Sequence, residues 1–264
     1  MKGTMLELNS ITKYFSRNTV NEKIAVSGLS LSVPTGQFVT IIGSNGAGKS
    51  TLLNLVAGVY PVDEGSVFFD GADVTKLVEH KRASYVGRIF QNPMMGTASS
   101  MTIEENLVLA EERGKKRTLR WGVTNSRRRR YREMLSMLGL GLENRLKESV
   151  RFLSGGQRQS LALIMAVLNP PRLLLLDEHT AALDPKTAGV VMEHTGRLVR
   201  EFNLTTLMVT HNLNLAIDFG HRLIMMHEGN IRFQVEGSEK KDLTVNDVIS
   251  RFGVTQDKSL FGAG

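Results

Sequence analysis

The first third of the chain alternates between hydrophobic and polar positions in a way that predicts β-strands. Residues 5–14 and 24–33 are rich in apolar side chains with partial alternation, and the polar stretch 16–23 joins them. Such alternation is typical of strands with one buried face. Residues 38–42 form a short, mainly β-branched run, which indicates a buried central strand. Residues 65–70 end at an Asp-Gly turn and predict a further strand.

Apolar residues at helical spacing predict helices further along the chain. Lys49–Ala57 and residues 157–168 both show this spacing, and a glycine or proline segment follows each of them. Residues 101–153 contain many long-chain residues and few β-branched ones, which favours a largely helical segment. Residues 244–247 match a capping box for a short helix that runs to Phe252.

Three more apolar runs, at residues 173–176, 205–209 and 223–227, predict buried strands between these helices. Strands that alternate with helices predict an α/β fold with a mostly parallel sheet. Residues 253–264 show no clear period. No apolar run reaches the ~18 residues that a membrane-spanning helix needs. We therefore expect the chain to stay in the cytoplasm and to reach a membrane only through a partner.

The composition narrows the class of protein only a little. Hydrophobic residues make up 41% and charged residues 22%, an ordinary globular balance that argues against global disorder. The absence of cysteine excludes disulfides, thiolate nucleophiles and cysteine-ligated metal sites. The net charge of +7 suits nucleic acid, anionic lipid or polyanionic ligands and does not choose among them.

A phosphate-binding loop is the strongest chemical signal in the sequence. Residues 43–50 match the pattern G-x-x-x-x-G-K-[ST] between a predicted strand and a predicted helix. Glycines let successive backbone N–H groups curl around phosphates, and the helix directs its positive dipole end at them. Lys49 is expected to reach the β- and γ-phosphates, and the Ser50 hydroxyl to bind Mg²⁺. The predicted nucleotide contacts here are Gly43, Ser44, Asn45, Gly46, Ala47, Gly48, Lys49, Ser50 and Thr51.

Two further segments extend the predicted site. Four leucines at residues 173–176 deliver Asp177 and Glu178 to the end of a buried strand. Asp177 is expected to hold Mg²⁺ through water and Glu178 to polarise the attacking water, although two acids can also merely cap a strand. Residues 153–157 read Leu-Ser-Gly-Gly-Gln before a helix, which resembles a second phosphate cradle. A chain with two cradles can enclose nucleotide between two copies of itself.

Together these motifs resemble the ATPases of the ABC family, in the family's order and over nearly the whole chain. Gln91, in Phe-Gln-Asn-Pro, matches the Q-loop glutamine, and Asp184, in Ala-Ala-Leu-Asp, matches the D-loop. His211, in Val-Thr-His-Asn, matches the switch histidine. The resemblance implies that residues 153–157 are the family's signature segment. It also implies a head-to-tail dimer in which each ATP lies between one phosphate loop and the signature segment of the partner. Four residues would serve the partner's ATP: Ser154, Gly155, Gly156 and Gln157.

The resemblance also implies roles for single residues. Gln91 would link Mg²⁺ and water to the membrane partner, and Ser50, Gln91 and Asp177 would form the metal site. His211 would contact the γ-phosphate and help to hold the water, and Asp184 would carry signals across the dimer. An aromatic side chain near the N-terminus would stack on adenine; of the adjacent Tyr14 and Phe15 we prefer Phe15, while either ring could simply pack against the sheet.

The fold that the resemblance implies is a P-loop NTPase core, with a mostly parallel sheet flanked by helices. An N-terminal antiparallel β subdomain and an inserted α-helical subdomain complete it. The whole chain would be a single ABC ATPase domain. We place the core with its β subdomain at residues 1–92 and 153–236, the helical subdomain at 93–152, and a C-terminal helix and tail at 237–264.

Some positions depart from the family's commonest pattern. His179 stands where proline usually follows the acidic pair, and Ala181 replaces serine in the D-loop. The helix after the signature segment lacks its usual arginine. These departures suggest a particular subfamily and remove no catalytic group. The basic stretch at residues 114–132, which includes Arg127–Arg130, is either a contact for anionic lipid or acidic permease loops, or a solvated basic face.

The function expected from the resemblance is ATP hydrolysis, with ATP and Mg²⁺, that powers a transporter for uptake of an amino acid or another small solute. The expected partners are transmembrane permease subunits, a second copy of the ATPase and an extracytoplasmic solute-binding protein, at the cytoplasmic face of the membrane. Alternatives are a soluble ATPase for cytosolic assembly of the iron–sulfur type, and a lipid or lipoprotein exporter. Nucleic-acid-handling relatives usually carry a coiled coil, zinc-binding cysteines or tandem ATPase units, so we expect no nucleic acid partner.

Overall fold

The computed structural model describes residues 3–115 and 122–252, and the chain forms two compact units. The first unit comprises Met1–Arg82 and Thr205–Gly264, and the second comprises Ala83–Leu204. The predicted tail at residues 253–264 lies outside the described residues, as do Lys116, Arg117 and Arg120 of the basic stretch. The division into core, helical subdomain and C-terminal segment stays a prediction.

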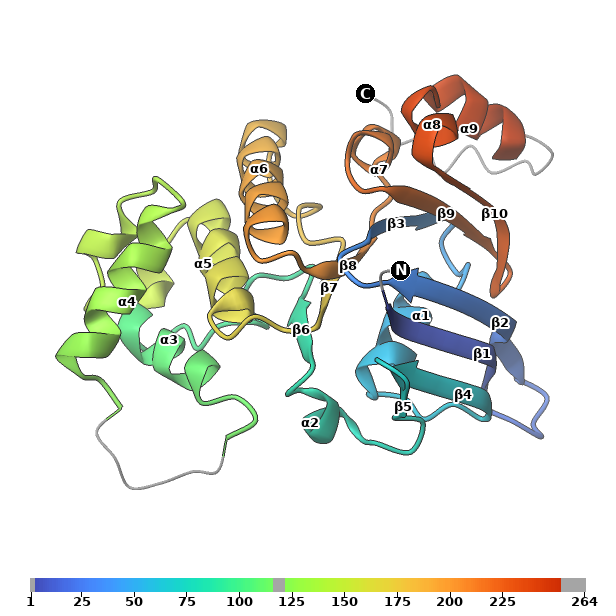
Figure 1. Cartoon of the computed structure of the whole chain (residues 1–264), viewed down its shortest axis with the longest axis horizontal. Helices are drawn as coiled ribbons and strands as arrows, with labels where there is room; N and C mark the ends of the chain where they lie inside the picture. The colour runs from blue at the N-terminus through green and yellow to red at the C-terminus, as the bar shows by residue number, and fades with distance from the viewer. Residues whose placement is uncertain (1–2, 116–121, 253–264) are drawn as a thin grey trace. The chain divides into compact units, whose positions relative to one another are not determined.

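An antiparallel sheet forms one layer of the first unit, with strand order β2-β1-β4-β5 (Figure 1). Its strands are β1 (Thr4–Phe15), β2 (Lys23–Pro34), β4 (Glu64–Phe69) and β5 (Ala72–Asp73). Leu8 of β1 lies opposite Leu31 of β2 and Val67 of β4, and all three side chains are buried. The alternation seen in the sequence therefore places one face of this sheet in the core, and the predicted antiparallel subdomain is confirmed.

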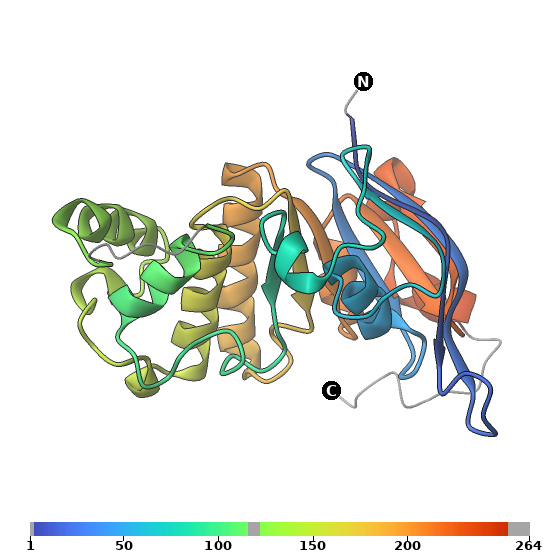
Figure 2. The same ribbon diagram turned by 90° about the horizontal axis from the view of Figure 1, so that it is seen from below.

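Parallel strands form the second layer of this unit. They are β3 (Phe38–Gly43), β8 (Thr205–Val209) and β9 (Arg222–His227), with β10 (Asn230–Glu236) antiparallel to β9. β3 lies between β8 and β9 and runs parallel to both. Every residue of β3 is buried, as its β-branched run predicted. Helix α1 (Lys49–Ala57) packs against β2 on one side and against β3 and β8 on the other (Figure 2).

Short helices pack near the C-terminal end of the described chain. They are α7 (Leu213–Asp218), α8 (Gly237–Lys241) and α9 (Val245–Phe252). Ala216 of α7 and Val248 of α9 belong to one apolar cluster with Ile42 of β3. The predicted capping box is present, because the Thr244 hydroxyl accepts from the N–H of Asp247 at 3.2 Å. These helices bury one side of the strand that leads into the phosphate loop.

A buried arginine ties the end of α1 to the antiparallel layer. Arg82, the last residue of α2 (Glu79–Arg82), is 1% exposed. Its guanidinium donates to carbonyls in the last turn of α1, those of Leu55 at 2.7 Å and Val56 at 2.9 Å, where helical partners run out. It also donates to the carbonyls of Val74, Thr75 and Leu77. Burial lowers the pKa of Arg82 to about 10, so it remains a cation at neutral pH.

The described part of the second unit combines parallel strands with longer helices. These elements are β6 (Val86–Ile89), β7 (Leu173–Asp177), α3 (Ile103–Glu111), α4 (Asn125–Ser136), α5 (Gly155–Val167) and α6 (Pro185–Glu201). Two single turns of 3₁₀-helix, η1 (Leu142–Asn144) and η2 (Val150–Phe152), connect α4 to α5. α6 has 17 residues and no counterpart in the sequence analysis. Among the described residues, no helix has the length and apolarity required to cross a membrane.

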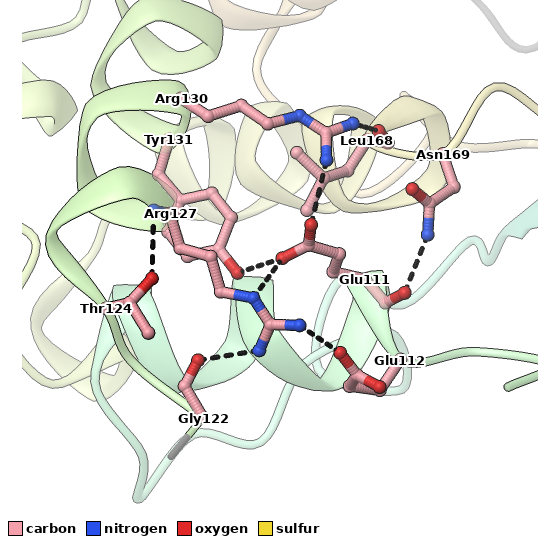
Figure 3. A network of polar contacts seen from close by, with 9 residues as sticks. All are labelled: Glu111, Glu112, Gly122, Thr124, Arg127, Arg130, Tyr131, Leu168 and Asn169. Carbon is pink, nitrogen blue, oxygen red and sulfur yellow. Dashed lines mark hydrogen bonds and ion pairs between the residues drawn. The ribbon is translucent and has the colours of Figure 1, made fainter. Parts of the chain in front are cut away.

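A buried carboxylate joins α3, α4 and the end of α5 (Figure 3). Glu111 accepts from Arg127 at 3.1 Å, from Arg130 at 2.8 Å and from the Tyr131 hydroxyl at 2.6 Å. Arg130 also donates to the carbonyl of Leu168, which caps α5. Burial and the bond to Glu111 raise the pKa of Tyr131, so the phenol stays a donor. The cluster thus fixes the C-terminal end of the helix whose other end carries the signature segment.

This pairing gives the basic run a structural role beside the two alternatives that the sequence leaves open. Arg127 also bonds Glu112, and Arg128 pairs with Glu104 at 2.8 Å. Three of the four consecutive arginines, 127, 128 and 130, are therefore held by carboxylates of the same unit. Arg129 is exposed. These ion pairs stabilise the helical unit. Three of the four arginine charges are compensated within the unit, which weakens the argument for contact with anionic lipid.

We expect Glu111→Gln to destabilise the fold by about 2 kcal/mol, because Arg127 and Arg130 lose the charge that compensates them. This loss of unfolding free energy is smaller than that of a fully buried ion pair, because the two arginines are 25% and 44% exposed. The midpoint of thermal unfolding should fall by about 4–8 °C. The matched control is Glu112→Gln, whose carboxylate is 37% exposed and should cost less than about 0.5 kcal/mol. Equal losses in the two variants would contradict a special role for Glu111.

Candidate functional site

The phosphate loop leaves β3 and enters α1 through backbone conformations that only glycine adopts easily. Gly43 has φ +152°, and a Cβ there would lie 2.3 Å from the carbonyl oxygen of Met226. Gly48 has φ +95°, and a Cβ there would lie 2.3 Å from the carbonyl oxygen of Ala25. Neighbouring backbone therefore approaches the loop too closely for side chains at both positions. The loop predicted at residues 43–50 adopts the expected strand–loop–helix geometry.

Lys49 folds back into this loop. It is 6% exposed, and its ammonium donates to the carbonyls of Gly43 at 2.7 Å and Ser44 at 2.9 Å. The residue before α1 is Gly48, which has no side chain that could cap the first turn of the helix. A helix N-terminus with a lysine beside it attracts anions. The geometry suits a polyphosphate.

His211 lies at the same edge of the sheet as the phosphate loop. β3 and β8 are parallel, with Ile41 beside Val209, so their carboxyl ends meet at one edge. The N–H of Thr210 donates to the carbonyl of Ile41 at 3.1 Å, which joins the segment after β8 to β3. His211 follows immediately, and its side chain is exposed. The first unit therefore brings together the phosphate loop and the predicted switch histidine.

The second unit gathers three other predicted residues at a corresponding edge. β6 and β7 run parallel, with Ile89 beside Leu176. Asp177 is the last residue of β7 and Glu178 follows it, while Gln91 lies two positions after the end of β6. The carboxyl ends of neighbouring parallel strands are the usual place for ligand-binding side chains. The acidic pair and the predicted Q-loop glutamine thus emerge from adjacent strands.

Arg88 is a neighbour of the acidic pair that the sequence analysis missed. Its guanidinium lies 3.3 Å from the Asp177 carboxylate, with side chains 14% and 15% exposed. Its guanidinium also lies 4.8 Å from the centre of the Phe90 ring. The sequence does contain a signal for this contact: Arg88 is a cation within an otherwise apolar run of residues, and such a cation needs a partner. Arg88 holds Asp177 at the end of its strand.

Glu178 occupies an uncommon backbone conformation. Its φ is +46°, in the left-handed region that side chains other than glycine seldom adopt. Its carbonyl accepts from the N–H of Ala181 at 2.9 Å, which closes a tight turn. Non-glycine residues in this region persist where the surrounding structure holds them, and they cluster at functional sites. The turn belongs to a segment that ends at Asp184.

The signature segment begins a helix with a capping box. The Ser154 hydroxyl accepts from the N–H of Gln157 at 3.2 Å, and the Gln157 side chain accepts from the N–H of Ser154 at 3.1 Å. Ser154 and Gly155 are exposed, while Gly156 is buried. A Cβ at Gly156 would lie 2.2 Å from the Thr187 side chain, so this glycine lets α5 and α6 approach closely. The first turn of α5 presents small residues and backbone donors.

Asp184 caps α6. Its carboxylate accepts from the N–H of Thr187 at 3.1 Å, and Pro185 occupies the first helical position. Hydrogen bonds from Thr187 keep the pKa of Asp184 below its usual value, so the cap is charged at neutral pH. The predicted D-loop therefore has a structural role that the sequence analysis did not recognise.

The two candidate adenine platforms differ in their surroundings. The Phe15 ring meets Tyr60 edge to face, with ring centres 5.4 Å apart. The Arg17 guanidinium lies 4.4 Å from the centre of the Tyr14 ring, over one face of it. Tyr14 also bonds Glu64 through its hydroxyl. The Lys13 ammonium lies 5.9 Å from the centre of the Phe15 ring, so each of the two rings has a cation near it.

Each unit carries its own share of the predicted residues. The first carries the phosphate loop, His211 and Phe15. The second carries Gln91, the acidic pair, the signature segment and Asp184. The Ser50 hydroxyl, Gln91 carbonyl oxygen and Asp177 carboxylate are hard oxygen donors, a set whose chemistry fits Mg²⁺.

Comparison with known proteins identifies relatives of this arrangement. The profile of the family described as "ABC transporter" matches residues 26–181. The chain is 46% identical to a tyrosine transport ATP-binding protein of Clostridioides difficile, over 94% of this chain and 98% of that protein. It is 33% identical to a methionine import ATP-binding protein of Bartonella henselae, over 91% of this chain and 66% of that protein. A spermidine/putrescine import ATP-binding protein of Haemophilus influenzae is 32% identical over 94% of this chain, which spans 62% of that relative.

Solved structures agree with these relatives. An ATP-binding cassette solved as a dimer in a post-hydrolysis state, with ADP and phosphate bound, is 30% identical. It covers 88% of this chain and 98% of its own, with a TM-score of 0.74. Another cassette, in its ADP conformation, is 28% identical and covers 94% of this chain and 98% of its own, with a TM-score of 0.79. These likenesses confirm the predicted α/β fold of a P-loop ATPase.

Proposed function

The chain belongs to the ABC transporter family, and from this premise we propose that it is the ATP-hydrolysing subunit of an uptake system for an amino acid or a related small solute. As a member of this family it binds and hydrolyses ATP. The observation that carries the substrate class is the 46% identity to a tyrosine transport ATP-binding protein, along 98% of that protein's length. The methionine and polyamine relatives are also named for the import of small organic solutes.

In this proposal the triphosphate lies along residues 43–51. Backbone N–H groups of the loop and of the first turn of α1 donate to its oxygens. Lys49 exchanges the carbonyls of Gly43 and Ser44 for the β- and γ-phosphates, a short movement because its ammonium already lies inside the loop. Phe15 stacks on adenine in this proposal; unlike Tyr14, its side chain has no hydroxyl bonded to Glu64.

Glu178 is the proposed general base. It accepts a proton from the water that attacks the γ-phosphate, as a carboxylate at the end of a buried strand can do. His211 contacts the γ-phosphate and helps to hold that water. Its place beside the phosphate loop at the edge of one sheet supports this assignment.

Ser50, Gln91 and Asp177 would hold Mg²⁺, with Asp177 acting through water. When bound, the ion neutralises charge on the β- and γ-phosphate oxygens. Arg88 keeps Asp177 at the strand end, since the two side chains lie 3.3 Å apart. The Asp177 carboxylate is therefore fixed before nucleotide arrives.

A second copy of the chain completes each site in a head-to-tail dimer. Ser154, Gly155, Gly156 and Gln157 of one copy close over the triphosphate bound by the other, with α5 directing its N-terminus at the phosphates. Asp184 carries signals between the copies. The exposure of Ser154 and Gly155 supports this arrangement, as does the dimeric state of a solved relative with ADP and phosphate.

Transmembrane permease subunits are the proposed membrane partner, and they hold the chain at the cytoplasmic face of the membrane. The segment after Gln91 offers a contact for them, because the side chains of Met94 and Met95 are 55% and 68% exposed. Methionine adapts well to a partner's surface. An extracytoplasmic solute-binding protein would deliver the solute to these permease subunits.

Deletion and purification together test this function. Loss of the chain from its own cells should abolish high-affinity uptake of labelled tyrosine or of another amino acid, and the wild-type chain should restore it. The Glu178→Gln variant should not restore it. A tagged chain solubilised from membranes should copurify with a polytopic permease. Copurification with cytosolic proteins alone, together with normal uptake of every amino acid in the deletion strain, would contradict the proposal.

A further inference from the structure

The residue after Glu178 is a completely enclosed histidine. His179 is 2% exposed, and its Nε2 lies 3.1 Å from the hydroxyl oxygen of Thr195 in the middle of α6. Thr195 is itself fully buried, and its hydroxyl donates to the carbonyl of Val191 at 2.8 Å. The His179 side chain thus connects the turn that contains Glu178 to helix α6.

The direction of this hydrogen bond follows from the protons available. The Thr195 hydroxyl has one proton, and the carbonyl of Val191 receives it. The imidazole must therefore donate its Nε2–H to the Thr195 oxygen, which fixes the tautomer of His179.

This bond completes the attachment of the segment from Glu178 to Asp184 to α6. At its far end Asp184 caps the helix through the N–H of Thr187. At its near end His179 bonds Thr195. Glu178, directly before His179, has φ +46°, a conformation that the surrounding structure has to hold. Without the His179 bond, the near end of the segment would lose this polar attachment to the helix.

We propose that His179, through its hydrogen bond to Thr195, is a positioning residue for Glu178: it holds the strained turn from which the Glu178 carboxylate acts on the attacking water. The inference rests on the proposed role of Glu178 as general base. Small displacements of a catalytic group cost rate steeply, with about 1 Å of misplacement worth about a hundredfold. ATP binding relies on the phosphate loop of the other unit, so loss of the bond should slow turnover and spare affinity.

The test is steady-state ATP hydrolysis by the full chain carrying His179→Ala or Thr195→Val. Each variant should lower kcat by about tenfold to a hundredfold and change the KM for ATP by less than about twofold. The double variant should be no slower than the slower single variant, because both changes remove the same bond. Thr195→Ser keeps the hydroxyl and His179→Gln keeps an N–H donor, so each should recover most of kcat.

A matched control lies next to Thr195 on the same helix. His194 contacts the Ser160 hydroxyl of α5 at 3.2 Å, an equivalent pair that does not involve the Glu178 turn. His194→Ala should leave kcat within about twofold of wild type. Normal kcat in His179→Ala and Thr195→Val would overturn the inference. It would also be overturned if Thr195→Ser were as slow as Thr195→Val and His179→Gln as slow as His179→Ala. Glu178→Gln is measured in parallel: if it is inactive while His179→Ala is normal, only the positioning role fails, and if it hydrolyses ATP normally, the general-base assignment fails.

Discussion

Glu178→Gln lowers the turnover number for ATP by about a thousandfold and leaves the affinity for ATP nearly unchanged. Loss of a positioned general base costs about 10²–10⁴ in rate, which corresponds to about 3–5 kcal/mol of activation free energy. Glutamine has nearly the same shape as glutamate, but its amide cannot accept a proton from the attacking water near neutral pH. Because the variant binds ATP without cleaving it, it should accumulate as an ATP-bound dimer.

Phosphate release at saturating ATP measures the first effect, and size-exclusion chromatography with and without ATP measures the second. Glu193→Gln is the matched control, since Glu193 is an exposed carboxylate on α6. It should hydrolyse ATP at the wild-type rate. Wild-type turnover by Glu178→Gln would assign the base to another group.

Lys49→Ala raises the dissociation constant for ATP by about tenfold to a hundredfold. The ammonium lies inside the phosphate loop, where it donates to the carbonyls of Gly43 and Ser44. A hydrogen bond to a charged group contributes about 1.5–3 kcal/mol, and alanine cannot replace it. Turnover falls with binding, because the β- and γ-phosphates lose their fixed counter-charge.

Titration calorimetry with ATP measures the change in affinity. Lys76→Ala removes an exposed lysine of the same unit and should bind ATP as the wild type does. Lys49→Met keeps the length of the side chain without its charge and should behave like Lys49→Ala. Wild-type affinity in both Lys49 variants would place the triphosphate outside this loop.

The phosphate loop could be predicted from the sequence because a short, fixed residue pattern marks it. The strand before the loop shows its burial directly in its β-branched run. The structure adds why two of the glycines are needed: Met226 and Ala25 bring backbone to within 2.3 Å of a Cβ at Gly43 and Gly48. These two partners are distant in sequence and could not be predicted.

Helix α6 was missed although its start was visible. Asp184 followed by Pro185 is a strong helix-start signal, and apolar residues recur at Val191, Leu198 and Val199. The sequence predicts a functional loop at Asp184, and the capping role of its side chain is visible only in the structure. The structure shows that the loop and the helix start are the same residues.

The contacts of His179, Arg88 and Arg127 could not be predicted, because their partners are distant in sequence. His179 meets Thr195 across a turn and half of a helix, and Arg88 meets Asp177 across two paired strands. Arg127 was read as part of a basic surface because nothing local marks Glu111 as its partner. Pairings of this kind depend on how helices pack, which a single sequence does not display.

The most direct measurement is a structure of the Glu178→Gln variant with Mg²⁺ and ATP. A catalytic site shared between two copies predicts that the Ser154 hydroxyl of one chain lies within about 3 Å of a γ-phosphate oxygen. The phosphate loop holding that nucleotide should belong to the other chain. Nucleotide bound by residues 43–50 with Ser154 of every neighbouring copy facing solvent would contradict the shared site.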